Sequence, residues 1–213
     1  MRCYAMTHRT LASLAALLLL AFPKANAQTT VTGHHLENTS VGFYGFSVNI
    51  PYNYIPYTPP KEKDFKIKTY GDMAWNNSLV IDRKAGFTAL ERLPFQSDYS
   101  GLVVSVVRCT LQIPSTKDKI NYLQFLDKFV SWTIVHSKDD FLRDTRPIGD
   151  IYVGRVARVY RKEVTAAYIV LIPPHTILTF QAACAEDNKT DLMQDLDAAI
   201  ATLDIGKRAK VSP

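Results

Sequence analysis

Residues 152–184 read YVGRVARVYRKEVTAAYIVLIPPHTILTFQAAC, and this stretch decides the fold. It contains three runs rich in β-branched and aromatic residues, at 152–162, 165–172 and 177–184. Alternation of apolar and polar residues is typical of a strand with one covered face. Only Pro173-Pro174-His175 separates the second run from the third, and so short a break favours a hairpin. The stretch therefore predicts three strands in close order, of which the last two are antiparallel.

Two other regions show the three–four spacing of apolar residues that predicts an amphipathic helix. The first covers residues 117–136 and includes Ile120 in its apolar stripe, with Ser115 or Thr116 as its N-terminal cap. The second covers residues 191–203, with Thr190 as its cap.

Shorter patterns fill the rest of the chain. Residues 45–50 alternate as a half-buried strand that Pro51 stops, and residues 64–70 alternate as a short strand with one solvated face. Residues 101–111 are apolar on both faces, which predicts a strand covered on both sides. The acidic residues within 139–144 predict a polar turn. The order of elements predicts an α+β domain in which a mainly antiparallel sheet is covered by two principal helices, 117–136 and 191–203.

Three of these features resemble the PsbP-like family of exported or lumenal domains. They are the opening strand GFSVNIP at 45–51, the hairpin at Pro173-Pro174, and the closing helix DLDAAIATL at 195–203. The resemblance implies an α+β fold over residues 40–205 and a protein that binds partners, since the family is not known as a catalytic class. It transfers no functional residue to this chain.

The first 27 residues predict export. Arg2 and Arg9 give a basic start, residues 11–22 form an unbroken small and apolar run, and Ala25-Asn26-Ala27 offers small residues to a signal peptidase. The apolar run is too short to span a bilayer, and no later stretch is long enough. We therefore expect cleavage before Gln28, a periplasmic or extracellular location, and no membrane span.

Removing residues 1–27 from the 213-residue chain leaves 186, enough for one domain with a sizeable core. We expect a flexible lead-in at 28–40, a single α+β domain at 41–205 and a basic tail at 206–213. The leader carries three positive charges and no carboxylate, so the formal net charge falls from +5 to +2. With a net charge this close to zero, the charge of the whole molecule does not favour binding to nucleic acid or to an anionic membrane.

Beyond the leader, the chain has two cysteines, Cys109 and Cys184. An exported protein matures in an oxidising compartment, where two thiols favour one disulfide. Both cysteines end apolar strand runs, so neighbouring strands could place them side by side. The alternative is two buried free thiols, because a free cysteine packs as a small apolar residue. We expect the disulfide.

The sequence predicts no catalytic residue, no metal ligand and no cofactor site. It contains no Gly-x-Ser-x-Gly elbow, no glycine-rich phosphate loop and no cysteine next to a likely base. His34 and His35 are adjacent and point in different directions, so a metal site would need at least one further ligand.

The strongest candidate for partner binding is the loop after the first strand. Tyrosine offers a large contact area at low entropy cost, and proline stiffens a loop before it binds. The loop combines these two residue types: Tyr52, Tyr54 and Tyr57 with Pro51, Pro56, Pro59 and Pro60. The alternative is a rigid loop whose rings pack back on the sheet.

A second candidate lies on the strand at 152–162. Alternation places Arg155 and Arg161 on one face, and Arg158 and Lys162 on the other, so the charges form no single patch. We keep Arg155 and Arg158 as candidates for partner binding. The alternative is a strand at the edge of the sheet, whose charges prevent it from pairing with another strand.

These observations favour an exported, non-enzymatic binding or accessory domain of the cell envelope, whose partner is another envelope or secreted protein. The alternative is a cell-envelope enzyme, above all a hydrolase, whose active site is scattered along the chain. A pocket with two titratable groups in opposed environments would favour the enzyme. A flat surface rimmed by Tyr52, Tyr54 and Tyr57 would favour binding.

Overall fold

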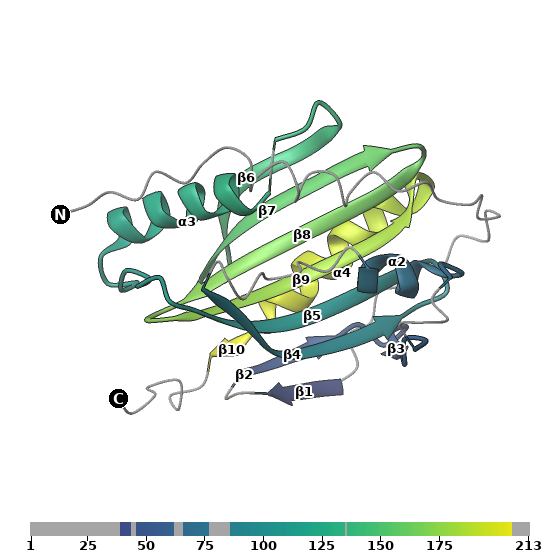
Figure 1. Cartoon of the computed structure of the whole chain (residues 1–213), viewed down its shortest axis with the longest axis horizontal. Helices are drawn as coiled ribbons and strands as arrows, with labels where there is room; N and C mark the ends of the chain where they lie inside the picture. The colour runs from purple at the N-terminus through teal and green to yellow at the C-terminus, as the bar shows by residue number, and fades with distance from the viewer. Residues whose placement is uncertain (1–38, 44–45, 62–65, 77–85, 135, 206–213) are drawn as a thin grey trace.

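The computed structural model describes residues 39–43, 46–61, 66–76, 86–134 and 136–205. The predicted leader, the basic tail and most of the predicted lead-in lie outside these residues. The main sheet has seven antiparallel strands in the order β3-β4-β5-β9-β8-β7-β6, and a smaller sheet pairs β1, β2 and β10 (Figure 1). The strands are β1 (Thr39–Phe43), β2 (Phe46–Ile50), β3 (Ile55–Pro56), β4 (Phe87–Gln96), β5 (Ser100–Cys109), β6 (Asp140–Ile148), β7 (Ile151–Tyr160), β8 (Glu163–Ile172), β9 (Thr176–Ala185) and β10 (Asp204–Ile205).

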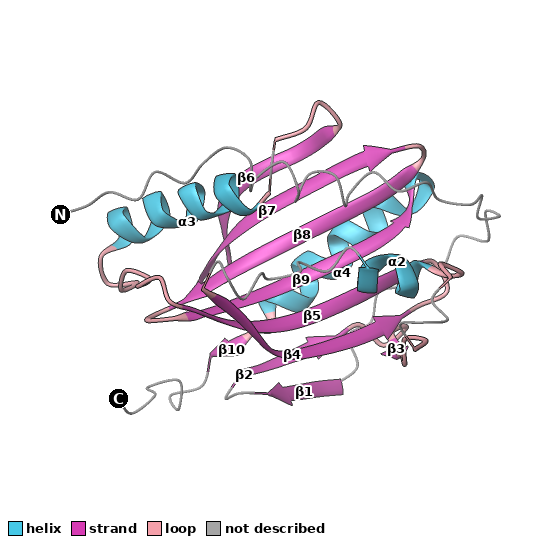
Figure 2. Cartoon of the chain, viewed as in Figure 1, coloured by secondary structure: helices cyan, strands magenta, loops and turns pink. Residues whose placement is uncertain are grey.

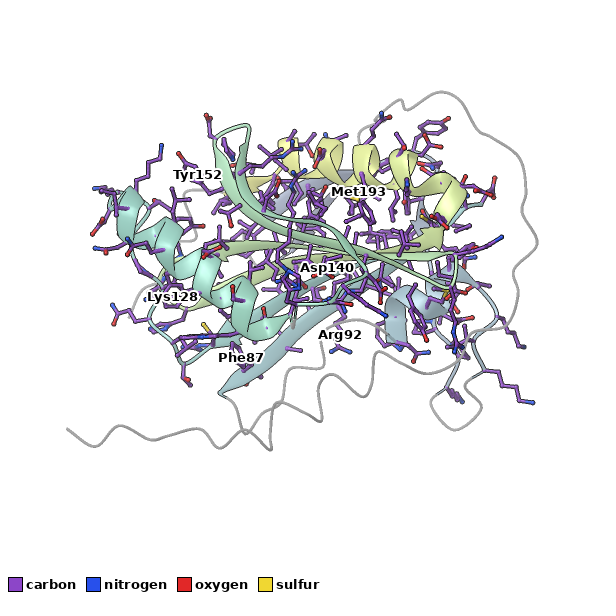
Figure 3. All side chains as sticks on the ribbon, turned by 90° about the horizontal axis from the view of Figure 1, so that it is seen from above. Phe87, Arg92, Lys128, Asp140, Tyr152 and Met193 are labelled. Atoms are coloured by element: carbon purple, nitrogen blue, oxygen red, sulfur yellow. The ribbon has the colours of Figure 1, made fainter. Side chains whose placement is uncertain are left out.

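Helices cover both faces of the main sheet (Figure 2). Among the described residues the helices are α2 (Tyr70–Asn76), α3 (Lys119–Thr133) and α4 (Lys189–Ala201), the last preceded by a 3₁₀ turn, η4 (Glu186–Asn188). α4 lies on one face, whereas α2 and α3 lie on the other, as Met193 of α4 and Lys128 of α3 show in Figure 3. Among the described residues, no helix is long and apolar enough to cross a membrane. The predicted α+β class, with a mainly antiparallel sheet covered by helices, is confirmed.

The core forms on both sides of β5, as its apolar run predicts. Val104 joins the cluster beneath α4, Val107 joins the cluster beneath α3, and Val103 joins a small cluster beneath α2. The predicted hairpin between β8 and β9 is also present, with a cis bond between Pro173 and Pro174. The central strands are therefore placed as the sequence predicts.

α3 occupies the predicted helical region with a narrower apolar stripe and a different cap. Leu126 is fully buried, but Ile120 is 71% exposed because, at about 100° per residue, it lies on the side of the helix opposite the buried Tyr122 and Phe129. The cap is Asp118, whose Oδ1 accepts a hydrogen bond from the backbone N–H of Asn121. The predicted caps Ser115 and Thr116 were wrong. Likewise, α4 begins at Lys189, so the predicted cap Thr190 lies inside the helix.

The strand predicted at 64–70 is wrong for the residues that the structure describes. Residues 66–69 form no strand, and α2 begins at Tyr70. The reason is a reciprocal cap: Thr69 Oγ1 accepts from the N–H of Asp72 at 3.1 Å, and Asp72 Oδ2 accepts from the N–H of Thr69 at 3.0 Å. This local pairing outweighs the weak alternation of the preceding residues.

Of the polar turn predicted at 139–144, Asp139 does lie in a turn, but residues 140–144 are the start of β6, an edge strand paired with β7. Its acidic side chains bind arginines: Asp140 contacts Arg143 and Arg158, and Asp144 contacts Arg155. β7 is also shorter than predicted, because positive φ angles of 51° and 66° place residues 161–162 in the turn to β8. The prediction missed β6 because ion pairs, and not apolar alternation, fix its side chains.

Candidate functional site

The loop of residues 51–61 joins β2 to the rest of the chain and contains all three predicted tyrosines. Its first part is a tight turn, in which the N–H of Tyr54 donates to the carbonyl of Pro51 at 3.0 Å. Tyr54 is only 6% exposed and lies in the core beneath α4, where its hydroxyl shares a hydrogen bond with Ser100 Oγ. Burial raises the pKa of Tyr54, so the ring stays neutral. Tyr54 therefore packs in the core, as the alternative interpretation predicts.

Tyr57 fixes the other side of the loop. Its N–H donates to the carbonyl of Pro94 at 2.8 Å, and its hydroxyl donates to Asp72 in the first turn of α2. Burial, followed by the hydrogen bond and the charge of Asp72, raises the pKa of Tyr57 to about 12. Asp72 is the residue that the sequence analysis missed, and the T-x-x-D spacing of a helix cap was the signal that could have revealed it.

Between these two anchors the loop presents apolar side chains to solvent. Ile55 and Pro56 form the short edge strand β3 against β4, and both are exposed. Ile55 is 66% exposed and Tyr52 is 44% exposed. Of the three predicted tyrosines, Tyr52 is the most exposed, and Ile55 is an exposed apolar side chain that the sequence analysis did not single out. We call residues 51–61 the anchored loop.

Next to the anchored loop, the turn between β4 and β5 contains a group of buried hydroxyls. Ser97 Oγ lies 2.9 Å from Ser100 Oγ and accepts from the N–H of Ser100 at 3.1 Å. Tyr99 donates to Asp195 of α4. His175 lies at the opposite end of β5, where its carbonyl accepts from the N–H of Cys109. These hydroxyls therefore lie in a turn that connects the anchored loop to α4, whereas the imidazole of His175 lies at the opposite end of β5.

The predicted arginines bind within the protein. Arg155 is 5% exposed, and its guanidinium donates to both carboxylate oxygens of Asp144, at 2.8 and 2.6 Å. It also lies 3.4 Å from Asp197 of α4. Arg158 Nε lies 3.2 Å from Asp140, on the other face of the sheet. Arg155 thus joins β6, β7 and α4, and its role as a partner contact stays a prediction.

The structure does not form the predicted disulfide, because Cys109 and Cys184 are both free and buried. Cys184 pairs with Ser100 at one end of β5, whereas Cys109 lies at the other end, about 30 Å away at a strand rise of ~3.3 Å per residue. A disulfide needs Cα atoms within about 7 Å. The two thiols also face opposite sides of the sheet. Burial raises the pKa of Cys184 to about 12, which suppresses its reactivity.

Comparison with known proteins was made by sequence and by fold. No protein-family model matches the chain, and no curated protein matches its sequence. Among solved structures, LpqN, involved in cell envelope biogenesis of Mycobacterium tuberculosis, is similar at 14% identity and a TM-score of 0.40, over 78% of this chain and 88% of LpqN. A structure from Bacteroides thetaiotaomicron is similar at 10% identity and a TM-score of 0.40, over 79% of this chain and 48% of that chain.

A third similar structure is the cyanobacterial PsbP protein of Synechocystis sp. PCC 6803. The match has 12% identity and a TM-score of 0.42, and it covers 84% of this chain and 97% of that chain. The similarity to the PsbP family is therefore weak and concerns the fold alone.

Proposed function

We propose that the protein is an exported, non-enzymatic binding or accessory domain of the cell envelope, and that it binds its partner through the anchored loop. The observation that carries the proposal is the exposure of Ile55, at 66%, between two tyrosines whose hydroxyls are hydrogen-bonded within the protein. An apolar side chain held out on a fixed loop is suited to an intermolecular contact.

The anchors of the loop support this proposal on energetic grounds. A flexible loop loses conformational entropy when it binds, and this loss subtracts from the affinity. Here the hydrogen bonds of Tyr54 and Tyr57, together with the prolines, hold the loop before any partner arrives. The contact residues Tyr52, Ile55 and Pro56 can therefore bind with little further ordering.

The export part of the proposal rests on the leader sequence. Protein recovered from the native host should begin at Gln28, which mass spectrometry of the intact chain would establish. Recovery of exported protein that still carries residues 1–24 would contradict the proposed processing.

The binding part can be tested by photo-crosslinking in the native host. A photoreactive amino acid at position 55 should give a discrete adduct with a partner molecule. The same amino acid at position 120 is the matched control, because Ile120 is also an exposed isoleucine, at 71%, but lies on α3. Equal adducts at both positions, or none at position 55, would contradict binding through the anchored loop.

A further inference from the structure

Two buried hydroxyls lie side by side on the face of the main sheet that α2 and α3 cover. Ser105 of β5 is 5% exposed, and Thr179 of β9 is 1% exposed. They are direct partners in the antiparallel register, so their Cβ atoms lie on the same face about 5 Å apart. Neither hydroxyl oxygen has a hydrogen-bond partner in the part of the chain that the structure describes.

These hydroxyls interrupt an apolar surface. Val103 and Val107 lie two residues to either side of Ser105 on β5, and so they share its face. Val103 packs beneath α2, and Val107 packs beneath α3. Valine at positions 105 and 179 would continue this packing, whereas a buried hydroxyl without a partner is unfavourable. The pair therefore weakens the core, which favours a role in binding.

Arg92 of β4 adds a positive charge to the same row. It pairs with Ser105, so that Arg92, Ser105 and Thr179 lie in line across three neighbouring strands. Its guanidinium lies over the ring of Trp75 in α2, 5.7 Å from the ring centroid, and Trp75 packs against the cluster that contains Val103. This contact holds the guanidinium on the same face as the two hydroxyls. Stacking uses the flat face of the guanidinium, and its N–H groups lie along the rim.

No carboxylate of the described strands lies beside this row. The other charged side chains on this face of the strands are Arg143, Arg158, Asp140 and Glu163. Asp140 lies four strands from β5 and is bound by both of these arginines. Glu163 is the first residue of β8, six residues and about 20 Å from Ile169, which pairs with Thr179. Glu91, next to Arg92, pairs with Val106 and so lies on the face that α4 covers.

The two helices over this face do not neutralise Arg92 with an inward carboxylate. Asp72 of α2 accepts from Tyr57 of the anchored loop. The charged residues of α3 are all exposed: Lys119, Asp127 and Lys128. Burial lowers the pKa of Arg92, because the charged guanidinium loses hydration, and a negative charge beside it would compensate for this loss.

We propose that Arg92, Ser105 and Thr179 bind the oxyanion of a small ligand, a carboxylate or a phosphate, between α2 and α3. The guanidinium supplies the charge, and the two hydroxyls donate to the oxyanion. Figure 1 shows α2 and α3 at opposite ends of this face, and Figure 3 places Arg92 between them. This site goes beyond the proposed function and uses no residue of the anchored loop.

The test is calorimetric titration of the purified protein with sodium acetate and with inorganic phosphate, against sodium chloride at the same ionic strength. At least one oxyanion should bind where chloride does not. Binding of acetate alone supports a carboxylate ligand, binding of phosphate alone supports a phosphate ester, and binding of both supports a site for either. Ser105→Ala and Thr179→Val should each weaken binding about tenfold, and Arg92→Gln about 100-fold.

A second measurement separates binding from folding. In chloride, Thr179→Val should raise the melting temperature by about 2–4 °C, because it replaces an unpartnered hydroxyl with a methyl group of similar size. The matched controls are Thr176→Val and Arg108→Gln, on β9 and β5. These two residues pair with each other on the opposite face of the sheet, so oxyanion binding should stay within about twofold of the unchanged protein.

The proposal would be overturned if neither oxyanion bound more tightly than chloride, or if Thr179→Val bound as tightly as the unchanged protein. The two hydroxyls would then hold an ordered water only. Equal losses in Thr176→Val and Arg108→Gln would also contradict it, since binding would then not depend on this row. Crosslinking at position 55 tests the anchored loop separately, so the failure of one proposal leaves the other standing.

Discussion

The hydrogen bond between Tyr57 and Asp72 should couple the stability of the anchored loop to that of α2. The Asp72 carboxylate is 2% exposed and accepts from the N–H groups of Lys68 and Thr69, from Thr69 Oγ1 and from Tyr57. A hydrogen bond to a charged group contributes about 1.5–3 kcal/mol, and the half-buried ring of Tyr57 places its bond near the lower end. Tyr57→Phe should therefore lower the free energy of unfolding by about 1–2 kcal/mol.

Asp72→Ala should cost more, about 2–4 kcal/mol, since it removes the helix cap and leaves buried N–H donors without an acceptor. The double variant should cost less than the sum of the two single variants by about 1–2 kcal/mol, because the shared bond can be lost only once. Urea denaturation of the three variants measures this difference.

Tyr160→Phe is the matched control, because its half-buried ring lies in β7, and it should change the free energy of unfolding by less than about 0.5 kcal/mol. Additive costs for Tyr57→Phe and Asp72→Ala, within about 0.3 kcal/mol, would refute the coupling.

Three other measurements test the fold. Leu126→Ala should lower the free energy of unfolding by about 3–5 kcal/mol, because its side chain is fully buried between α3 and the sheet; a cost below about 1 kcal/mol in urea denaturation would mean that α3 packs elsewhere. Thiol labelling of the unfolded, unreduced protein should modify both Cys109 and Cys184, and protection of the pair would show that they are bonded. Folding raises the pKa of Tyr57 and of Tyr122 from 10 to about 12, so the stabilisation that their neutral hydroxyls contribute should be present in full below pH 10 and should be lost as the pH rises towards about 12. A free energy of unfolding that stays constant over this pH range would contradict the raised pKa values.

The central part of the fold could be predicted from sequence because it depends on short-range patterns. β5, β8 and β9 contain apolar runs long enough to show which faces are covered, and the prolines at 173–174 mark the hairpin between two of them. β6 could not be predicted in this way. Its acidic side chains find arginines on β7, and those pairings become visible only when the two strands lie side by side.

The cysteines show a second limit of sequence patterns. Cys109 and Cys184 both end apolar strands, and β5 and β9 are indeed neighbours. The antiparallel register, however, places the end of one strand beside the start of the other, so the two thiols lie at opposite ends of the pair. Strand direction decided the outcome, and nothing in the local composition around either cysteine specifies it.

The anchored loop shows why the same residue type has opposite roles at neighbouring positions. The sequence identifies tyrosines at 52, 54 and 57 but not which way each ring points. Ser100 and Asp72, distant in sequence from Tyr54 and Tyr57, supply the hydrogen bonds that hold these two rings against the protein. Fixing them leaves the residues between them, Ile55 above all, as the outer surface of the loop. The contact surface that we propose is therefore a consequence of tertiary hydrogen bonds, and for this reason loss of the Asp72 bond should weaken binding even though Asp72 itself is buried.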